Sequence, residues 1–175
     1  LRIGPLEMRW YGLMYLLAFT AAYFVIRASV HKRGVPLTKD GIADLVFAVA
    51  VGIIVGGRLG YIIFYNLGYY LANPLKLLAV WEGGMSFHGG FAGALISGII
   101  FCRKRKLNFL EIADIGFLTA PIGLMFGRIG NFINGELYGR VTDVPWGVVF
   151  PGAGNLPRHP SQLYESLLEG PVTFF

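Results

Sequence analysis

Charged residues are scarce in this 175-residue chain. Only 14% of the residues are Asp, Glu, Lys or Arg, whereas 55% are hydrophobic, and the mean hydropathy is +0.59. A soluble domain carries roughly 25% charged residues, so this composition is too apolar for a surface that faces water. Disorder is excluded as well, because disordered chains combine low hydrophobicity with high net charge. We therefore predict an integral membrane protein.

Cysteine is nearly absent. The single Cys102 excludes an internal disulfide and a cysteine-based metal site. Its place at the end of an apolar run favours a small buried hydrophobic residue over a nucleophile. The other ligand-type residues form no convincing metal cluster, and we expect no cofactor.

Long apolar runs are abundant, and about 17–25 such residues cross a bilayer as a helix. Residues 132–159 are instead polar and rich in Gly and Pro, which predicts a small extracytoplasmic cap with a short hairpin. The predicted fold is an all-α polytopic helix bundle, a single membrane domain over residues 1–175 that includes this cap. Its spans are expected at residues 10–30, 41–67, 87–102 and 109–130, with a partial helix from 161.

Lys and Arg are distributed unevenly between the predicted loops. Residues 31–40 and 103–108 hold seven of the fifteen cations. The positive-inside rule places these two loops in the cytoplasm, so the N-terminus, the 68–86 loop and the cap are expected to face outward. The net charge of +5 is explained by topology and anionic lipid, and no nucleic-acid partner is expected.

Glycine is frequent, with 25 residues, and several glycines lie four residues apart within predicted spans. Small residues at this spacing let membrane helices approach closely, and we expect close helix packing at most of them. The glycines concerned are Gly52, Gly56 and Gly60, then Gly89 and Gly93, then Gly123 and Gly127.

Ionisable residues within predicted spans are candidate functional groups, because burying charge in a membrane is costly. Arg58 lies in the middle of the second span, where a functional role and a structural ion pair are equally supported. Glu111 and Asp114 are expected to form solvated pairs near the 103–106 cations. His88 opens the third span, and it is either an interfacial residue or a proton acceptor.

The densest polar motif is 127–140, where the fourth span leaves the membrane. It contains Arg128, Asn131, Glu136 and Arg140 among four glycines. Arginine pairs with phosphate oxygens through two parallel hydrogen bonds, and glycine lets backbone N–H groups approach an anion. This combination favours a phosphate-bearing lipid headgroup. A polar cap held by an Arg140–Glu136 salt bridge would explain the charges but not the glycines.

Five motifs closely resemble those of the bacterial prolipoprotein diacylglyceryl transferases, in the same order along nearly the whole chain. They are residues 10–15 (WYGLMY), 56–61 (GGRLGY), 85–90 (MSFHGG), 127–140 (GRIGNFINGELYGR) and 156–165 (LPRHPSQLYE).

The resemblance implies a bacterial inner-membrane enzyme whose N-terminus and active site face outward. Such enzymes transfer the diacylglyceryl group of phosphatidylglycerol to the lipobox cysteine thiol of a prolipoprotein. A thioether forms and glycerol-1-phosphate is released, which is the first step of lipoprotein maturation. The implied partners are phosphatidylglycerol, other membrane lipid and the prolipoprotein signal peptide. The functional positions that the resemblance implies are Tyr11, His88, Arg128, Asn131, Glu136 and Gly139.

Roles follow from the chemistry of this reaction. The thiol must lose a proton, and His88 is the candidate acceptor, with Tyr11 or a phosphate oxygen as alternatives. Arg128 is expected to stabilise the departing phosphate. Asn131 and Glu136 are expected to orient the glycerol headgroup. Gly139 and Arg140 complete the expected binding site.

Two features depart from the family pattern. Family members continue into further spans that carry another functional arginine, and their cap is often longer than residues 141–160. We therefore expect this sequence to supply only part of the site. One alternative is a lipid-binding or transporter-like membrane protein that holds anionic headgroups without catalysis. The other is a structural scaffold, which predicts that Arg128→Ala and His88→Ala leave cellular function unchanged.

Overall fold

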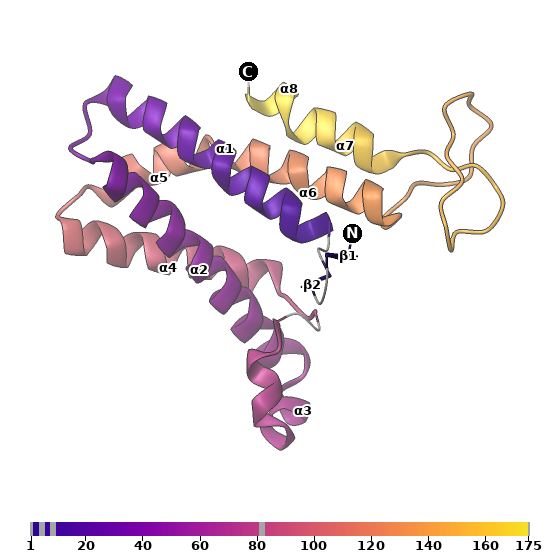
Figure 1. Cartoon of the computed structure of the whole chain (residues 1–175), viewed down its shortest axis with the longest axis horizontal. Helices are drawn as coiled ribbons and strands as arrows, with labels where there is room; N and C mark the ends of the chain where they lie inside the picture. Colours follow the sequence, from indigo (N-terminus) through magenta and orange to yellow (C-terminus); the bar gives the residue numbers. More distant parts are fainter. Residues whose placement is uncertain (1, 4–5, 8–9, 81–82, 175) are drawn as a thin grey trace. The chain divides into compact units, whose positions relative to one another are not determined.

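The chain forms two compact helical units, Val30–Asp114 and Leu1–Ser29 with Ile115–Phe175. The computed structural model describes residues 2–3, 6–7, 10–80 and 83–174. Figure 1 shows the helices along the chain. The helices are α1 (Trp10–Arg33), α2 (Lys39–Tyr65), α3 (Leu67–Ala72), the 3₁₀ helix η1 (Pro74–Leu78), α4 (Phe87–Arg105), α5 (Phe109–Phe117), α6 (Ala120–Asn134), α7 (Ser161–Glu169) and α8 (Pro171–Phe174). Two short strands, β1 (Arg2–Ile3) and β2 (Leu6–Glu7), pair antiparallel.

Helices α2 and α4 lie side by side and form the main contact within the unit Val30–Asp114 (Figure 1). Each begins at a hydroxyl cap: Thr38 Oγ1 accepts a hydrogen bond from the Gly41 N–H, and Ser86 Oγ accepts one from the Gly89 N–H. Such caps satisfy backbone donors that a helix start leaves free. The caps therefore define where each helix begins.

Glycines line the α2–α4 contact, as the four-residue spacing predicted. A Cβ on Gly56 would overlap the Gly89 carbonyl oxygen, and one on Gly60 would lie 2.8 Å from Gly89 Cα. A Cβ on Gly52 would lie 2.8 Å from Ser97 Cβ. The two backbones thus touch where side chains are missing. Gly123 and Gly127 differ, because a Cβ on either would meet open space.

In the other unit, α6 packs against α7 (Figure 1). The break between α5 and α6 has a local cause, because Pro121 lies at the start of α6 and lacks the N–H that a continuous helix would use. Helix α6 ends at Gly135, whose φ of 67° is left-handed, a conformation that glycine adopts without strain.

In the part of the chain that the structure describes, three helical segments are long and apolar enough to cross a membrane: Gly12–Arg33, Lys39–Tyr65 and Phe109–Asn134. Within the described residues, the predicted span at 87–102 is also helical, but it is not among these three. Its helix ends in the basic residues 103–105. The all-helical, polytopic membrane fold is confirmed.

The cap forms less regular structure than a hairpin. Arg158 makes single antiparallel bridges to both Val141 and Val148. The cap thus contains isolated bridges around Arg158 in place of the two paired strands of a hairpin. Cys102 is free and buried, as predicted.

The glycine contact predicts a clear difference between two substitutions. Gly56→Ala should destabilise the protein by about 1–3 kcal/mol, because its Cβ forces α2 and α4 apart. Gly116→Ala, also helical but facing open space, should be neutral or stabilise by up to about 1 kcal/mol through helix propensity. Unfolding by sodium dodecyl sulfate in mixed micelles measures both. Equal destabilisation by the two variants would contradict the close approach.

Candidate functional site

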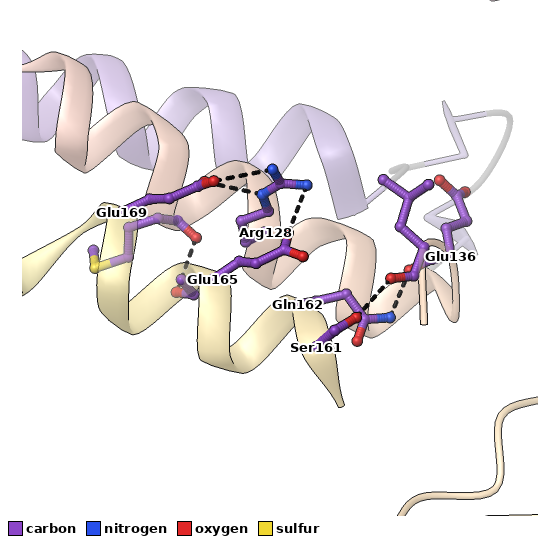
Figure 2. A network of polar contacts seen from close by, with 9 residues as sticks. Arg128, Glu136, Ser161, Gln162, Glu165 and Glu169 are labelled. Carbon is purple, nitrogen blue, oxygen red and sulfur yellow. Dashed lines mark hydrogen bonds and ion pairs between the residues drawn. The ribbon is translucent and has the colours of Figure 1, made fainter. Parts of the chain in front are cut away.

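Arg128 on α6 is held by two carboxylates of α7 (Figure 2). Its Nε and Nη2 donate to Glu169 Oε2 and Oε1 at 3.0 and 3.1 Å. Its Nη1 forms an ion pair with Glu165 Oε2 at 2.9 Å. The Arg128 side chain is 29% exposed, and the side chains of Glu165 and Glu169 are 39% and 33% exposed. This partly enclosed cluster is the candidate site.

The spacing of polar residues on α7 brings both carboxylates to Arg128. Residues 162, 165, 166 and 169 lie three or four apart, so they share one face of the helix. On this face Ser166 Oγ donates to the Met125 carbonyl at 3.2 Å. Gln162, which is fully buried, donates to the Glu136 carbonyl. The same face thus binds both α6 and the start of the cap (Figure 2).

Backbone contacts near Gly139 join the first part of the cap to its last residues, just before α7 begins. The Gly139 N–H donates to the His159 carbonyl at 2.9 Å, and the His159 N–H donates to the Arg140 carbonyl at 3.0 Å. A Cβ on Gly139 would lie 2.9 Å from both the Cβ and the carbonyl oxygen of His159. Gly139 is therefore required for close approach of two backbone segments.

Aromatic residues support this part of the cap. The Arg158 guanidinium lies over the Tyr138 ring at 5.1 Å, and Tyr138 stacks on Phe150. The Trp146 indole donates to the Tyr164 hydroxyl at 2.7 Å, and that hydroxyl lies 3.2 Å from His159 Nδ1. Because the hydroxyl already accepts from the indole, its own proton can be donated to Nδ1.

The predicted site residues fall into both units. Asn131, three residues after Arg128 on α6, is partly buried, while Glu136 and Arg140 are exposed. His88 is exposed in the first turn of α4, in the unit Val30–Asp114. Tyr11 belongs to α1, but its side chain lies outside the described residues. The structure thus pairs Arg128 with residues of α7. It pairs Gly139 with His159, which lies just before α7.

Arg58 is structural, and its partners differ from the ion pair considered above. The side chain is 4% exposed. Among the described residues, its guanidinium donates to the carbonyls of Lys76, Leu77, Gly83 and Gly84. It also lies 4.9 Å from the centre of the Tyr70 ring. One arginine thus organises the loop between α2 and α4.

The acidic residues at the other end of this unit pair differently from the prediction. Asp114 lies 3.7 Å from Arg33 Nη1, not beside the 103–106 cations. Arg105 of that cluster instead binds Asp44 near the start of α2. Both pairs are solvated, and such pairs contribute little to stability.

Glu165, Glu169, Gln162 and Ser166 were not predicted as site residues. Their signal was present in the sequence, because polar residues at helical spacing on one face are unusual in so apolar a chain. Groups of His, Cys, Asp and Glu suited to a metal ion are not found within the described residues.

The helical spans and an arginine held at the end of one of them define a polytopic α-helical membrane protein with a polar site beside its cap. The family described as prolipoprotein diacylglyceryl transferase matches residues 1–175. The chain belongs to this family.

Relatives named phosphatidylglycerol–prolipoprotein diacylglyceryl transferase match nearly the whole chain. The protein of Geobacter sulfurreducens is 64% identical over 173 residues, covering 99% of this chain and 66% of the relative. The proteins of Desulfotalea psychrophila and Solidesulfovibrio magneticus are 52% and 56% identical, covering 98% of this chain and 63% and 66% of the relatives. The chain thus spans slightly less than two thirds of their length.

The contacts of Arg58 predict that lysine cannot replace it. Lys has one ammonium instead of a planar fork, so Arg58→Lys leaves several carbonyls of residues 76–84 without donors. Each buried unsatisfied group costs about 1–3 kcal/mol. Limited proteolysis should therefore cut the loop before α4 faster in Arg58→Lys than in Arg103→Lys, an exposed control. Equal cleavage rates would contradict this role.

Proposed function

We propose that the protein containing this chain transfers the diacylglyceryl group of phosphatidylglycerol to the lipobox cysteine of prolipoproteins. Membership of the family supports this reaction, and the observation that carries the proposal is the partly exposed Arg128 held beside the cap. An arginine in this setting suits a phosphate group in a lipid headgroup.

The charge changes in the reaction explain why arginine is needed. The cysteine sulfur attacks the glyceryl carbon that bears the phosphate, a C–S bond forms, and the C–O bond to the phosphate breaks. The singly charged phosphodiester becomes glycerol-1-phosphate, which carries a second negative charge. Arg128 therefore binds the departing phosphate more strongly in the transition state than in the substrate, which is the condition for catalysis.

The remaining predicted residues take the other roles. His88 is proposed to accept the thiol proton, with Tyr11 and a phosphate oxygen as the alternatives. Asn131 is proposed to orient the glycerol headgroup. Glu136 is proposed to share this role, and Gly139 and Arg140 are proposed to complete the binding site.

We also propose that the protein lies in the bacterial inner membrane with its cap outward. The basic residues 31–33 and 103–105 occupy the last turns of α1 and α4, and the Arg105–Asp44 pair joins the end of α4 to the start of α2. These contacts support a placement of the helix ends on one side of the membrane, the side that the positive-inside rule assigns to the cytoplasm.

A non-catalytic, lipid-binding or transporter-like protein is the alternative. Transport predicts a polar path through the bilayer centre, for which Arg58 was the candidate. Its guanidinium instead binds the carbonyls of a loop, so this residue offers no support for a path.

Replacing Arg128 tests the proposal. The protein at its natural length is reconstituted with phosphatidylglycerol and a peptide that contains one lipobox cysteine, and mass spectrometry follows the diacylglyceryl mass on the thiol. Arg128→Lys should lower the rate by ~10²–10³, the usual effect of removing such a contact. Arg103→Lys should retain the wild-type rate, because Arg103 is exposed, lies in the last turn of α4 and is not among the predicted site residues. Absence of the product from folded, lipid-binding wild-type protein would favour the non-catalytic alternative.

A further inference from the structure

The phosphate proposed above must bind a guanidinium that already has two carboxylate partners. Arginine has five N–H donors. Glu169 uses one on Nε and one on Nη2, and Glu165 lies at Nη1. The donors that remain are on Nη1 and Nη2, at the end of the side chain. A phosphate therefore approaches the same end of the guanidinium that Glu165 contacts.

The charges of the cluster also indicate that a phosphate must replace one of the carboxylates at Arg128. One guanidinium and two carboxylates carry a formal charge of −1, which disfavours the approach of a phosphate anion. Binding is favourable only once one carboxylate leaves the guanidinium. The two are not equivalent, because Glu169 forms two parallel hydrogen bonds whereas Glu165 forms one contact and is the more exposed. Paired hydrogen bonds fix orientation as well as adding energy.

We propose that Glu169 is a positioning residue that fixes the plane of the Arg128 guanidinium, and that Glu165 is the carboxylate that the lipid phosphate displaces. This assignment rests on the function proposed above and adds two residues to it. Figure 2 shows the arrangement: both carboxylates reach Arg128 from α7, one turn of that helix apart. Glu169 thus keeps Arg128 in place, while Glu165 occupies the position at Nη1 that the phosphate would take.

The two glutamates should respond differently to the same substitution. Glu169→Gln replaces one acceptor oxygen by an amide nitrogen, so the paired hydrogen bonds are lost. Misplacement of a catalytic group by about 1 Å costs about 10² in rate, so kcat should fall by about that factor with a smaller change in KM. Glu169→Asp keeps the charge and both oxygens and should recover part of kcat.

Glu165→Gln removes the competing negative charge but keeps the shape of the side chain. The KM for phosphatidylglycerol should then fall by about two- to fivefold, the range expected for one partly exposed ion pair, while Arg128 stays bound to Glu169. Asp143→Asn is the matched control, because it removes one exposed carboxylate of the cap, and its kcat and KM should equal those of the wild type.

The experiment measures kcat and KM for phosphatidylglycerol in mixed micelles, with the lipobox peptide at saturation and the protein at its natural length. Opposite effects, a lower kcat for Glu169→Gln and a lower KM for Glu165→Gln, support the assignment. If Glu169→Gln does not fold, Glu169→Asp replaces it, and a reduced kcat at unchanged KM supports the positioning role. An unchanged or higher KM for Glu165→Gln, or a wild-type kcat for the Glu169 variant, overturns the assignment. Failure of the wild type to transfer the diacylglyceryl group is a separate result, which overturns the proposed function itself.

Discussion

The pairing of Arg128 with Glu165 and Glu169 is the interaction on which the unit of Leu1–Ser29 and Ile115–Phe175 depends. An unpaired charge within a membrane helix is costly, and here Arg128 is paired with two carboxylates of α7. The same contacts hold α7 against α6, and the neighbouring Gln162 and Ser166 bind the backbone of α6 and of the cap. Pairing this one cation thus positions α7, and α7 in turn binds the start of the cap through Gln162.

A second arginine shows how different surroundings give the same residue type a different role. Arg58 is more buried than Arg128, and backbone carbonyls take up its donors. Carbonyls of a loop cannot move away without disrupting the loop, so these partners hold Arg58 in place. Carboxylates on flexible side chains can be exchanged for another anion. This contrast is why we treat Arg58 as structural and propose a ligand-binding role for Arg128.

Much of the fold could be predicted from the sequence, because membrane helices are long, apolar and locally hydrogen-bonded. The expected spans at 10–30, 41–67 and 87–102 fall largely on single helices, whereas 109–130 is divided between α5 and α6. The spacing of Gly52, Gly56 and Gly60 correctly indicated a close helix contact. The break at Pro121 and the end of α4 in basic residues were not predicted, because both depend on single residues at helix ends.

Only some residues of the candidate site could be predicted from the sequence. The motif at 127–140 identified Arg128, because an arginine among glycines at the end of a span is unusual. Its partners Glu165 and Glu169 lie about 40 residues further along, and pairing over that distance depends on how α7 packs, which spacing alone does not reveal. The partners of Arg58 were missed for a related reason, since backbone carbonyls carry no signature in a sequence.

The central claim is that Arg128 is a phosphate-binding group held ready by Glu169. An experimental structure of the protein at its natural length with bound phosphatidylglycerol tests this claim most directly. The account predicts a phosphate oxygen within hydrogen-bond distance of Arg128 Nη1 or Nη2, with the Glu169 pair kept and Glu165 turned away. A lipid phosphate bound elsewhere, with Arg128 still paired to both glutamates, would contradict it.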